Sequence, residues 1–336
     1  MPRFFGGLWM EAGGRRSCSD LLQATRPFAV ESPIRSWWYL FSTLAVLGCG
    51  LALTAQPFPW WIRLPLSVGT GLVVVRTFIL FHDHLHGALL RGSKLASCLL
   101  QPFGLLVMVP PTVWRETHNY HHAHTAKLVG SNIGSYPVMS TAQWAQATPA
   151  QRLKYRLVRH PLNILLGYFT IFMTDMCFAS FLRAPRKHRD SILALLLNWG
   201  LTALLIWRFG FFVWIYCFFV PLFVACSVGA YLFYAQHNYP DTNIQQREHW
   251  AYERAALESS SYMEMGPVMR WATANIGYHN VHHLNPSIPF YRLPEVMRAI
   301  PELQTAGRTS LSPKDIAACF RVKLWNPQTE KMVGFP

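Results

Sequence analysis

Four long runs of apolar residues most constrain what this chain can fold into. They cover residues 37–55, 64–81, 191–207 and 210–235, and Arg76 is the single charged residue within them. A helix rises about 1.5 Å per residue, so about 20 apolar residues cross the roughly 30 Å hydrocarbon core of a membrane. The runs therefore predict four membrane-spanning helices.

Short links join these runs in pairs. Residues 56–63 connect the first two runs and residues 208–209 connect the last two, so each pair is expected to form a hairpin. The cations that precede the first and third runs are Arg15, Arg16, Arg26, Arg35, Arg183, Arg186, Lys187 and Arg189. Because cytosolic loops of membrane proteins are enriched in Lys and Arg, both hairpins are expected to open to the cytosol, with both termini there.

Two further apolar stretches, 95–111 and 162–182, approach the length of a span. Prolines interrupt the first, and Asp175 lies in the second. If one of them alone crossed the membrane, the histidine-rich segments on its two sides would lie on opposite faces. We therefore expect both to be re-entrant or to lie at the interface. The alternative, that both span, would leave residues 112–161 on the outer face.

The composition is that of a membrane protein. Apolar residues make up 51% of the 336 residues and charged residues 14%, against about 25% in soluble domains. This excludes an intrinsically disordered chain. The net charge of +14 suits anionic lipid headgroups, and no nucleic-acid partner is expected. The first 36 residues lack the apolar core of a signal peptide and are expected to be a cytosolic tail.

The histidines are concentrated in four short windows. Residues at i, i+3 and i+4 share one face of a helix, so the spacing selects a pair, two triplets and an isolated histidine as candidate metal ligands. These nine are His82, His86, His118, His121, His122, His237, His279, His282 and His283. His84 and His124 point away from their neighbours, and His160, His188 and His249 lie elsewhere, so these five are not expected to be ligands.

The windows lie at the expected cytosolic ends of the spans or in polar segments on the same side, so they can converge on one site. Imidazole suits zinc, copper, iron and nickel, and nine histidines are too many for one ion but fit two. A histidine-rich metal transporter would instead carry ligands in the middle of its spans, which makes it the remote alternative. Side chains close enough in sequence to accept hydrogen bonds from the ligand imidazoles are Asp83, Glu116, Asn238, Asp241 and Asn275. Asn275 is expected on the same helix face as His279.

Three of the windows resemble known boxes. The segments His82-Asp-His-Leu-His86, His118-Asn-Tyr-His-His122 and His279-Asn-Val-His-His283 resemble the HxxxH, HxxHH and HxxHH boxes of the membrane fatty-acid desaturase family. Segments 233–237 and 282–293 are similar to those of bacterial acyl-lipid desaturases, and the resemblance covers about residues 37–300. Two positions depart from the family pattern. His84 and Leu85 replace a small residue or Cys-Gly in the first box, and Phe233 stands where some members carry an Asn.

The resemblance implies an all-α membrane protein with four transmembrane helices in two hairpins and a cytosolic helical cap that holds a di-iron site. A desaturase domain would cover residues 37–300, between cytosolic tails at 1–36 and 301–336. The implied ligands are the nine histidines, the implied cofactors are two iron ions, and O2 is the co-substrate. The implied reaction is desaturation of a fatty-acyl lipid in the bacterial cytoplasmic membrane, with the active site on the cytosolic side.

Electrons must come from a separate protein, ferredoxin-like or cytochrome b5-like, because the terminal segments carry no haem or iron–sulfur pattern. A basic surface could receive such an acidic donor or lipid headgroups. It is expected to include Arg152, Lys154, Arg156, Arg159, Arg186, Lys187 and Arg189. Aromatic and methionine residues that could line a substrate tunnel are Trp114, Trp144, Tyr262, Met265 and Trp271. A hydroxylase, ketolase or alkane monooxygenase of the same superfamily remains the alternative, since these reactions diverge only after the first hydrogen is removed.

Overall fold

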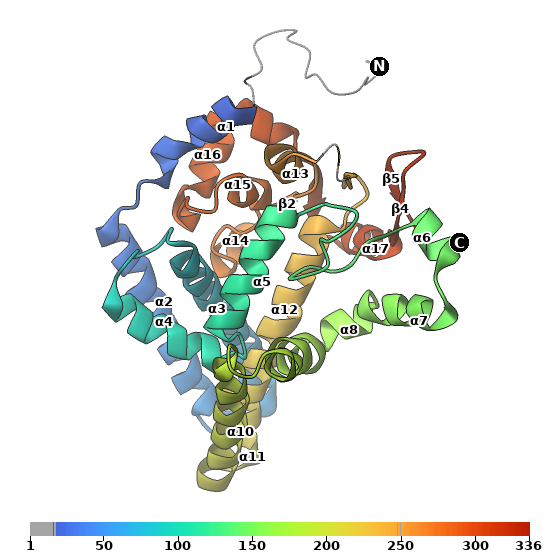
Figure 1. The fold of residues 1–336 in the computed structure, drawn as a ribbon. Coiled ribbons are helices and arrows are strands. Elements are labelled where there is room, and N and C mark those ends of the chain that lie inside the picture. The colour runs from blue at the N-terminus through green and yellow to red at the C-terminus, as the bar shows by residue number, and fades with distance from the viewer. Residues whose placement is uncertain (1–15, 17, 247, 249) are drawn as a thin grey trace.

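The computed structural model describes residue 16 and residues 18–246, 248 and 250–336, and most of them are helical (Figure 1). The helical elements are α1 (Cys18–Thr25), η1 (Arg26–Ala29), α2 (Pro33–Ala55), α3 (Trp60–His86), α4 (Lys94–Leu106), α5 (Pro111–His124), α6 (Thr141–Gln146), α7 (Pro149–Val158), α8 (Pro161–Leu165), η2 (Tyr168–Ala179), α9 (Ser180–Arg183), α10 (Arg189–Phe209), α11 (Phe211–Trp214), η3 (Ile215–Phe219), α12 (Val220–His237), α13 (Tyr252–Glu258), α14 (Pro267–Ala272), α15 (His279–Leu284), η5 (Phe290–Arg292), α16 (Leu293–Ala299), η6 (Pro301–Thr305) and α17 (Pro313–Arg321). The strands are β1 (Met139–Ser140), β2 (Tyr262–Glu264), β3 (Arg308–Ser310), β4 (Leu324–Asn326) and β5 (Lys331–Val333).

Among the described residues, four helices are long and apolar enough to cross a membrane, as the sequence predicts. They are α2, α3, α10 and the continuous helix Phe211–His237, which contains α11, η3 and α12. Pro33 lies in the first turn of α2. A backbone N–H at this position has no partner within the helix, so the N–H that proline lacks costs no hydrogen bond. At the other end of α3, Gly87 adopts a left-handed conformation with φ +71° and donates its N–H to the carbonyls of Asp83 and His84, which ends the helix.

The span α3 packs against two of the other spans. Residues 56–59 link α2 to α3, and these two helices pack together, while α3 also packs against α12. Exposed apolar side chains, such as those of Trp38 and Trp207, cover the outer faces of α2 and α10. The pairing of the spans into two hairpins and their orientation in a membrane stay predictions from the sequence.

The two shorter apolar stretches are bent or broken. Helices α4 and α5 are long and apolar enough to cross a membrane only when taken together, and they meet at an angle of 89°. Residues 162–182 lie in α8 and, after a break at residues 166–167, in the π-helical η2 and α9, which continue into each other, and neither part is as long as the four spans. If the bent pair counts as one span, the part of the chain that the structure describes has up to five.

The end of the molecule opposite α10 and α11 is formed by short elements, including α1, α13, α15 and α16 (Figure 1). Two small sheets, which the sequence does not predict, lie among them. Strand β4 pairs with β1 in parallel and with β5 in antiparallel orientation, and β2 pairs with β3 in parallel. Both sheets use strands from residues 301–336, so this segment, which the sequence suggests is a tail, folds onto the rest of the chain.

One buried apolar core joins the spans to these short elements. It runs from Leu80 and Phe81 on α3 through Leu232 on α12 to Val281 and Leu284 on α15. The ends of α3 and α12 are therefore held firmly against α15, and this junction carries the histidines.

Candidate metal centre

The nine candidate ligands come from four elements that meet at this junction. His82 and His86 form the last turn of α3, His237 ends α12, and α5 and α15 each carry a triplet. All are buried except His86 and His237, which are half-buried. The structure therefore brings together all nine histidines that the spacing selects.

The histidines form two groups, each with ring nitrogens within 4.8 Å of one another. The group of five contains His82, His86, His118, His122 and His282. The group of four contains His121, His237, His279 and His283. Each box with three histidines contributes to both groups.

Helix geometry explains this division. A residue at i+4 lies about 40° from residue i around the helix, whereas a residue at i+3 lies about 60° away in the other direction. His118 and His122 thus face one group while His121 faces the other. On α15 the same rule sends His279 and His283 to one group and His282 to the other.

The Nε2 atoms converge at short distances. In the group of five, Nε2 of His118 lies 2.9 Å from that of His82 and 3.1 Å from that of His122. In the group of four, Nε2 of His237 lies 3.0 Å from that of His121 and 2.9 Å from that of His279. Metal–nitrogen bonds of about 2.1 Å at right angles place neighbouring ligand nitrogens about 3 Å apart. The spacing therefore fits a metal ion in each group.

The protonation state of the imidazoles fits metal binding as well. Burial lowers the pKa of His279, His282 and His283 well below the usual value for histidine, so these rings are neutral at pH 7. Nδ1 of His237 lies 3.0 Å from the carbonyl oxygen of Ser259, which can only accept, so Nδ1 carries the proton and Nε2 carries a lone pair. Converging lone pairs repel each other unless a cation lies between them.

Neighbouring side chains orient the imidazole rings of His82 and His283 through their Nδ1 atoms. Asp83 accepts a hydrogen bond from Nδ1 of His82 at 3.0 Å and, through its other oxygen, from the backbone N–H of Phe290 at 2.8 Å. Thr125 donates to the carbonyl of His121, so its oxygen is free to accept from Nδ1 of His283 at 3.4 Å. Such contacts fix the ring orientation and raise ligand basicity.

A cavity of about 410 Å³ leads away from the histidines. His82, His118 and His279 are among its lining residues, and its walls come from α3, α12, η2 and the start of α5. Val74 lies eight residues before His82, so the cavity extends about 12 Å along α3. Its size and mainly apolar walls suit a long apolar ligand held beside the histidines.

The model of one family matches most of the chain. This is the fatty acid desaturase family, and the match covers residues 58–313. The chain belongs to this family. Desaturases are oxidoreductases, so the protein is an enzyme of that class, as the sequence predicts.

Individual desaturases match over most of their length. A fatty acid desaturase of Bacillus subtilis (strain 168) is 28% identical over 289 residues, which are 85% of this chain and 81% of the relative. An sn-1 oleoyl-lipid 12-desaturase of Picosynechococcus is 23% identical and covers 80% of this chain and 77% of its own length. An sn-1 acyl-lipid omega-3 desaturase (ferredoxin) of Synechocystis is 22% identical, with 80% and 76% covered.

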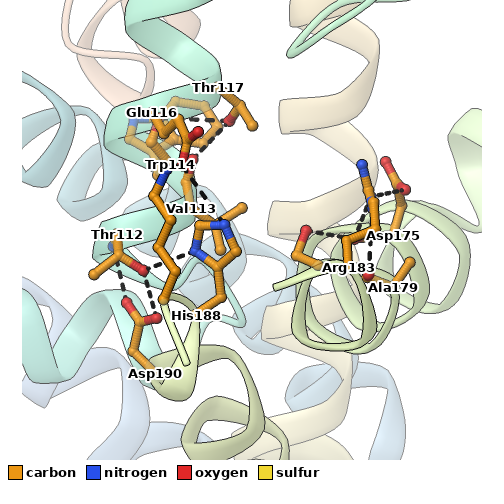
Figure 2. Close-up of polar contacts among 12 residues, drawn as sticks. Thr112, Val113, Trp114, Glu116, Thr117, Asp175, Ala179, Arg183, His188 and Asp190 are labelled. Carbon is orange, nitrogen blue, oxygen red and sulfur yellow. Dashed lines mark hydrogen bonds and ion pairs between the residues drawn. The ribbon is translucent and has the colours of Figure 1, made fainter. Parts of the chain in front are cut away.

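Of the five residues predicted to support the ligands of this desaturase, Asp83 alone contacts a ligand ring. Glu116 pairs with Lys187 at 2.7 Å. Near Glu116, Thr112 makes two hydrogen bonds to the carboxylate of Asp190 (Figure 2). The first turns of α5 are thus fastened to the first turn of α10 and to the loop before it. Asp241 is exposed to solvent.

Both asparagines serve other contacts. Asn238 donates to the carbonyl of Cys319 and accepts from Arg159. Asn275 is not on the helix of His279, because α14 ends at Ala272 and Asn275 has a φ of 60°. It donates to the carbonyl of Phe290, the residue whose N–H binds Asp83, so it supports the centre indirectly.

The predicted tunnel residues are scattered. Trp114 lines the cavity and stacks on His118, with ring centroids 4.6 Å apart. The others do not line it. Trp144 packs against Tyr155 and Phe335, the ring of Tyr262 lies tilted against that of Tyr278, Met265 lies in the core, and Trp271 receives the guanidinium of Arg76. Aromatic content alone did not distinguish packing residues from cavity walls.

The remaining histidines have structural contacts. Nδ1 of His84 donates to the carbonyl of Leu89, His124 stacks on Tyr120, and His160 caps α8 by accepting the N–H of Leu162. Nδ1 of His188 lies 3.3 Å from the hydroxyl of Thr112. His249 lies outside the described residues.

Several residues of the centre are not predicted from the sequence. Ser259 acts through its backbone carbonyl, which leaves no signal in its side chain, whereas Thr125, one turn after His121, could have been found by its spacing. Phe233 takes the place that an Asn holds in some family members, and its ring lies 4.8 Å from that of His121. It lines the cavity and covers the group of four.

Proposed function

We propose that this protein is an O2-dependent acyl-lipid desaturase that holds two iron ions, one in each histidine group. The observation that carries the proposal is the position of the cavity, whose wall includes His82 and His118 of the group of five and His279 of the group of four. An acyl chain in this cavity lies beside both groups. The cyanobacterial relatives are named as desaturases of acyl lipids, which supports this substrate class.

The chain contributes mainly by holding and positioning. Bound iron would supply, with O2 and external electrons, the oxidising power needed to remove two hydrogens from neighbouring methylenes. Val75, Phe78 and Ile79 on α3 face the cavity with Leu232 and Phe233 on α12, and these walls exclude water and hold the chain straight. The carboxylate of Asp83 keeps the proton of His82 on Nδ1, so that Nε2 faces the group of five.

The remaining parts of the proposal concern the surroundings of the enzyme. The domain would cover residues 37–300 and lie in the bacterial cytoplasmic membrane, with the histidines and both termini on the cytosolic side. The electron donor would be a separate ferredoxin-like or cytochrome b5-like protein. The name of the Synechocystis relative includes ferredoxin, which supports the first kind.

The test is expression in a host that lacks the activity, followed by mass spectrometry of its lipids and metal analysis of the purified protein. Desaturation removes two hydrogens from an acyl chain, whereas a hydroxylase adds one oxygen atom, so the masses separate the proposal from its alternative. His121→Ala should abolish product and lower iron content. His124→Ala, on the same helix as His121 but outside both groups, is the matched control and should retain both. Iron content unaffected by His121→Ala would overturn the di-iron assignment.

A further inference from the structure

A polar hollow lies on the surface beside the group of five. Its volume is about 440 Å³, and it is formed by the end of α3, the following turn, α4 and α5. Lining residues that matter for its chemistry are His84, His86, Arg91, Ser97, Gln101 and Arg115. We call it the Arg91–Arg115 hollow.

The hollow reaches the candidate metal centre through one residue. His86 is the one histidine of the nine that lines it. The ring of His86 packs against those of His82 and His122, with centroids 4.6 and 4.9 Å apart. A molecule seated in the hollow is therefore separated from the group of five by a single imidazole.

The hollow is positively charged. Arg91 and Arg115 are exposed, and no carboxylate is among the lining residues that the structure describes. The turn is shaped by Gly87 and Gly92, with φ values of +71° and +73°, and the side chain of Arg91 lies over Gly87. His84 is held by Leu89 and by the hydroxyl of Ser97, so the polar wall is ordered.

The basic surface expected from the sequence is less suited to this role. Arg159 is fully buried and donates to the carbonyl of Pro137, so it offers no charge to a partner. Lys187 is paired with Glu116 (Figure 2). Lys154 and Arg156 are exposed on α7, which lies across the molecule from α4 (Figure 1).

We propose that the Arg91–Arg115 hollow is the docking site of a small acidic electron-transfer protein, and that electrons enter the metal centre across His86. The inference rests on the proposed function. Opposite charge accelerates the encounter of such proteins, whose transient interfaces are small, and a hollow of this size admits a protruding loop of the partner. Each encounter oxidises the carrier by one electron. Two electrons, two protons and one O2 balance the removal of two hydrogens from the acyl chain, with two waters formed.

The first test measures binding and does not require turnover. The full-length protein in nanodiscs is titrated with a reduced plant-type [2Fe–2S] ferredoxin at several salt concentrations. Arg91→Glu with Arg115→Glu should weaken binding at least about tenfold and remove most of its salt dependence. Arg91→Lys with Arg115→Lys should retain binding, because the charge is kept. Lys154→Glu with Arg156→Glu is the matched control and should change binding less than about twofold.

The second test separates docking from chemistry. With dithionite as a small reductant, the Arg91→Glu, Arg115→Glu protein should form product in a single turnover as the wild type does, while turnover with ferredoxin falls. If this variant binds ferredoxin as tightly as the wild type, the docking proposal is wrong. If the wild type forms no unsaturated product with either reductant while the binding difference is present, the proposed function fails and the docking site stands.

Discussion

Asp83 holds the ring of His82, its neighbour in the chain, by accepting the Nδ1 proton at 3.0 Å. The second oxygen of the carboxylate binds the backbone N–H of Phe290 at 2.8 Å, so one side chain connects α3 to the segment that follows α15. Asp83 therefore orients the ring of His82 and also connects the end of α3 to the segment that follows α15.

Replacement of this carboxylate should weaken metal binding. Asp83→Asn retains the size of the side chain but removes its charge, which lowers the basicity of His82 and should reduce iron affinity by about 10- to 100-fold. Iron retained after dialysis against increasing chelator concentrations measures the effect. Glu116→Gln is the control, because Glu116 pairs with Lys187 and touches no ligand ring. Equal iron retention in both variants would contradict the role given to Asp83.

The histidines of α15 belong to two different groups, which leads to a second prediction. His279 and His282 are three residues apart on α15 but face different groups. His279→Ala should therefore remove a ligand from the group of four, and His282→Ala a ligand from the group of five. Mössbauer spectra of the iron-loaded variants should show the loss of different iron signals. Loss of the same signal from both variants would show that the two groups do not bind separate ions.

The sequence predicts well the apolar helices and the helix faces on which the nine histidines lie, because both depend on local periodicity, while the role of these histidines as metal ligands stays a prediction. Apolar runs of span length and histidines at i, i+3 and i+4 specify a helix and one of its faces, whatever the rest of the chain does. The expected bounds of the spans agree with the helices to within a few residues at each end.

Contacts over long distances in the chain are not predictable in this way. Asn275 was expected to share a helix with His279, but α15 begins only at His279, after a bridge between Tyr262 and Tyr278. Arg159 was expected on the surface, yet it is buried where Asn238 and Tyr234 surround its guanidinium. Both errors concern residues whose environment is set by partners far away in the sequence.

The buried Lys323 predicts an unusual pH dependence of stability. Burial, together with the nearby charge of Arg159, lowers the pKa of Lys323 from 10.5 to about 8, and its Nζ donates to the carbonyl of Arg159 at 2.7 Å. Between about pH 8 and 10.5 the unfolded chain binds more protons at this lysine than the folded chain, so folding becomes more favourable as the pH rises. The melting temperature of the wild type should therefore rise over this window relative to that of Lys323→Met.

The control for this prediction is Lys331→Met, an exposed lysine on β5. Its melting temperature should follow that of the wild type at every pH. Parallel curves for the wild type and Lys323→Met would contradict the assignment, because they would mean that Lys323 titrates alike in both states.

The glycine at position 229 in the cavity wall is expected to control the length of the acyl chain that the cavity accepts. Gly229 lines the cavity eight residues before His237, about 12 Å along the helix. A Cβ added at this position would lie 4.0 Å from the ring of Phe172, so an Ala fits, while a larger side chain must project toward that ring. Gly229→Leu should therefore exclude chains that run past this point and leave shorter chains as substrates.

The measurement is the distribution of chain lengths among unsaturated products when the host supplies a mixture of acyl chains. Gly229→Leu should shift it toward shorter chains, while Gly229→Ala should leave it nearly unchanged. Gly200→Leu is the matched control, because Gly200 is exposed on α10 with no heavy atom within 4 Å of an added Cβ. Replacing a helical glycine favours the helix by up to about 1 kcal/mol, so folding should be retained in all three variants. An unchanged product distribution in Gly229→Leu, with iron content intact, would show that the acyl chain does not pass between Gly229 and Phe172.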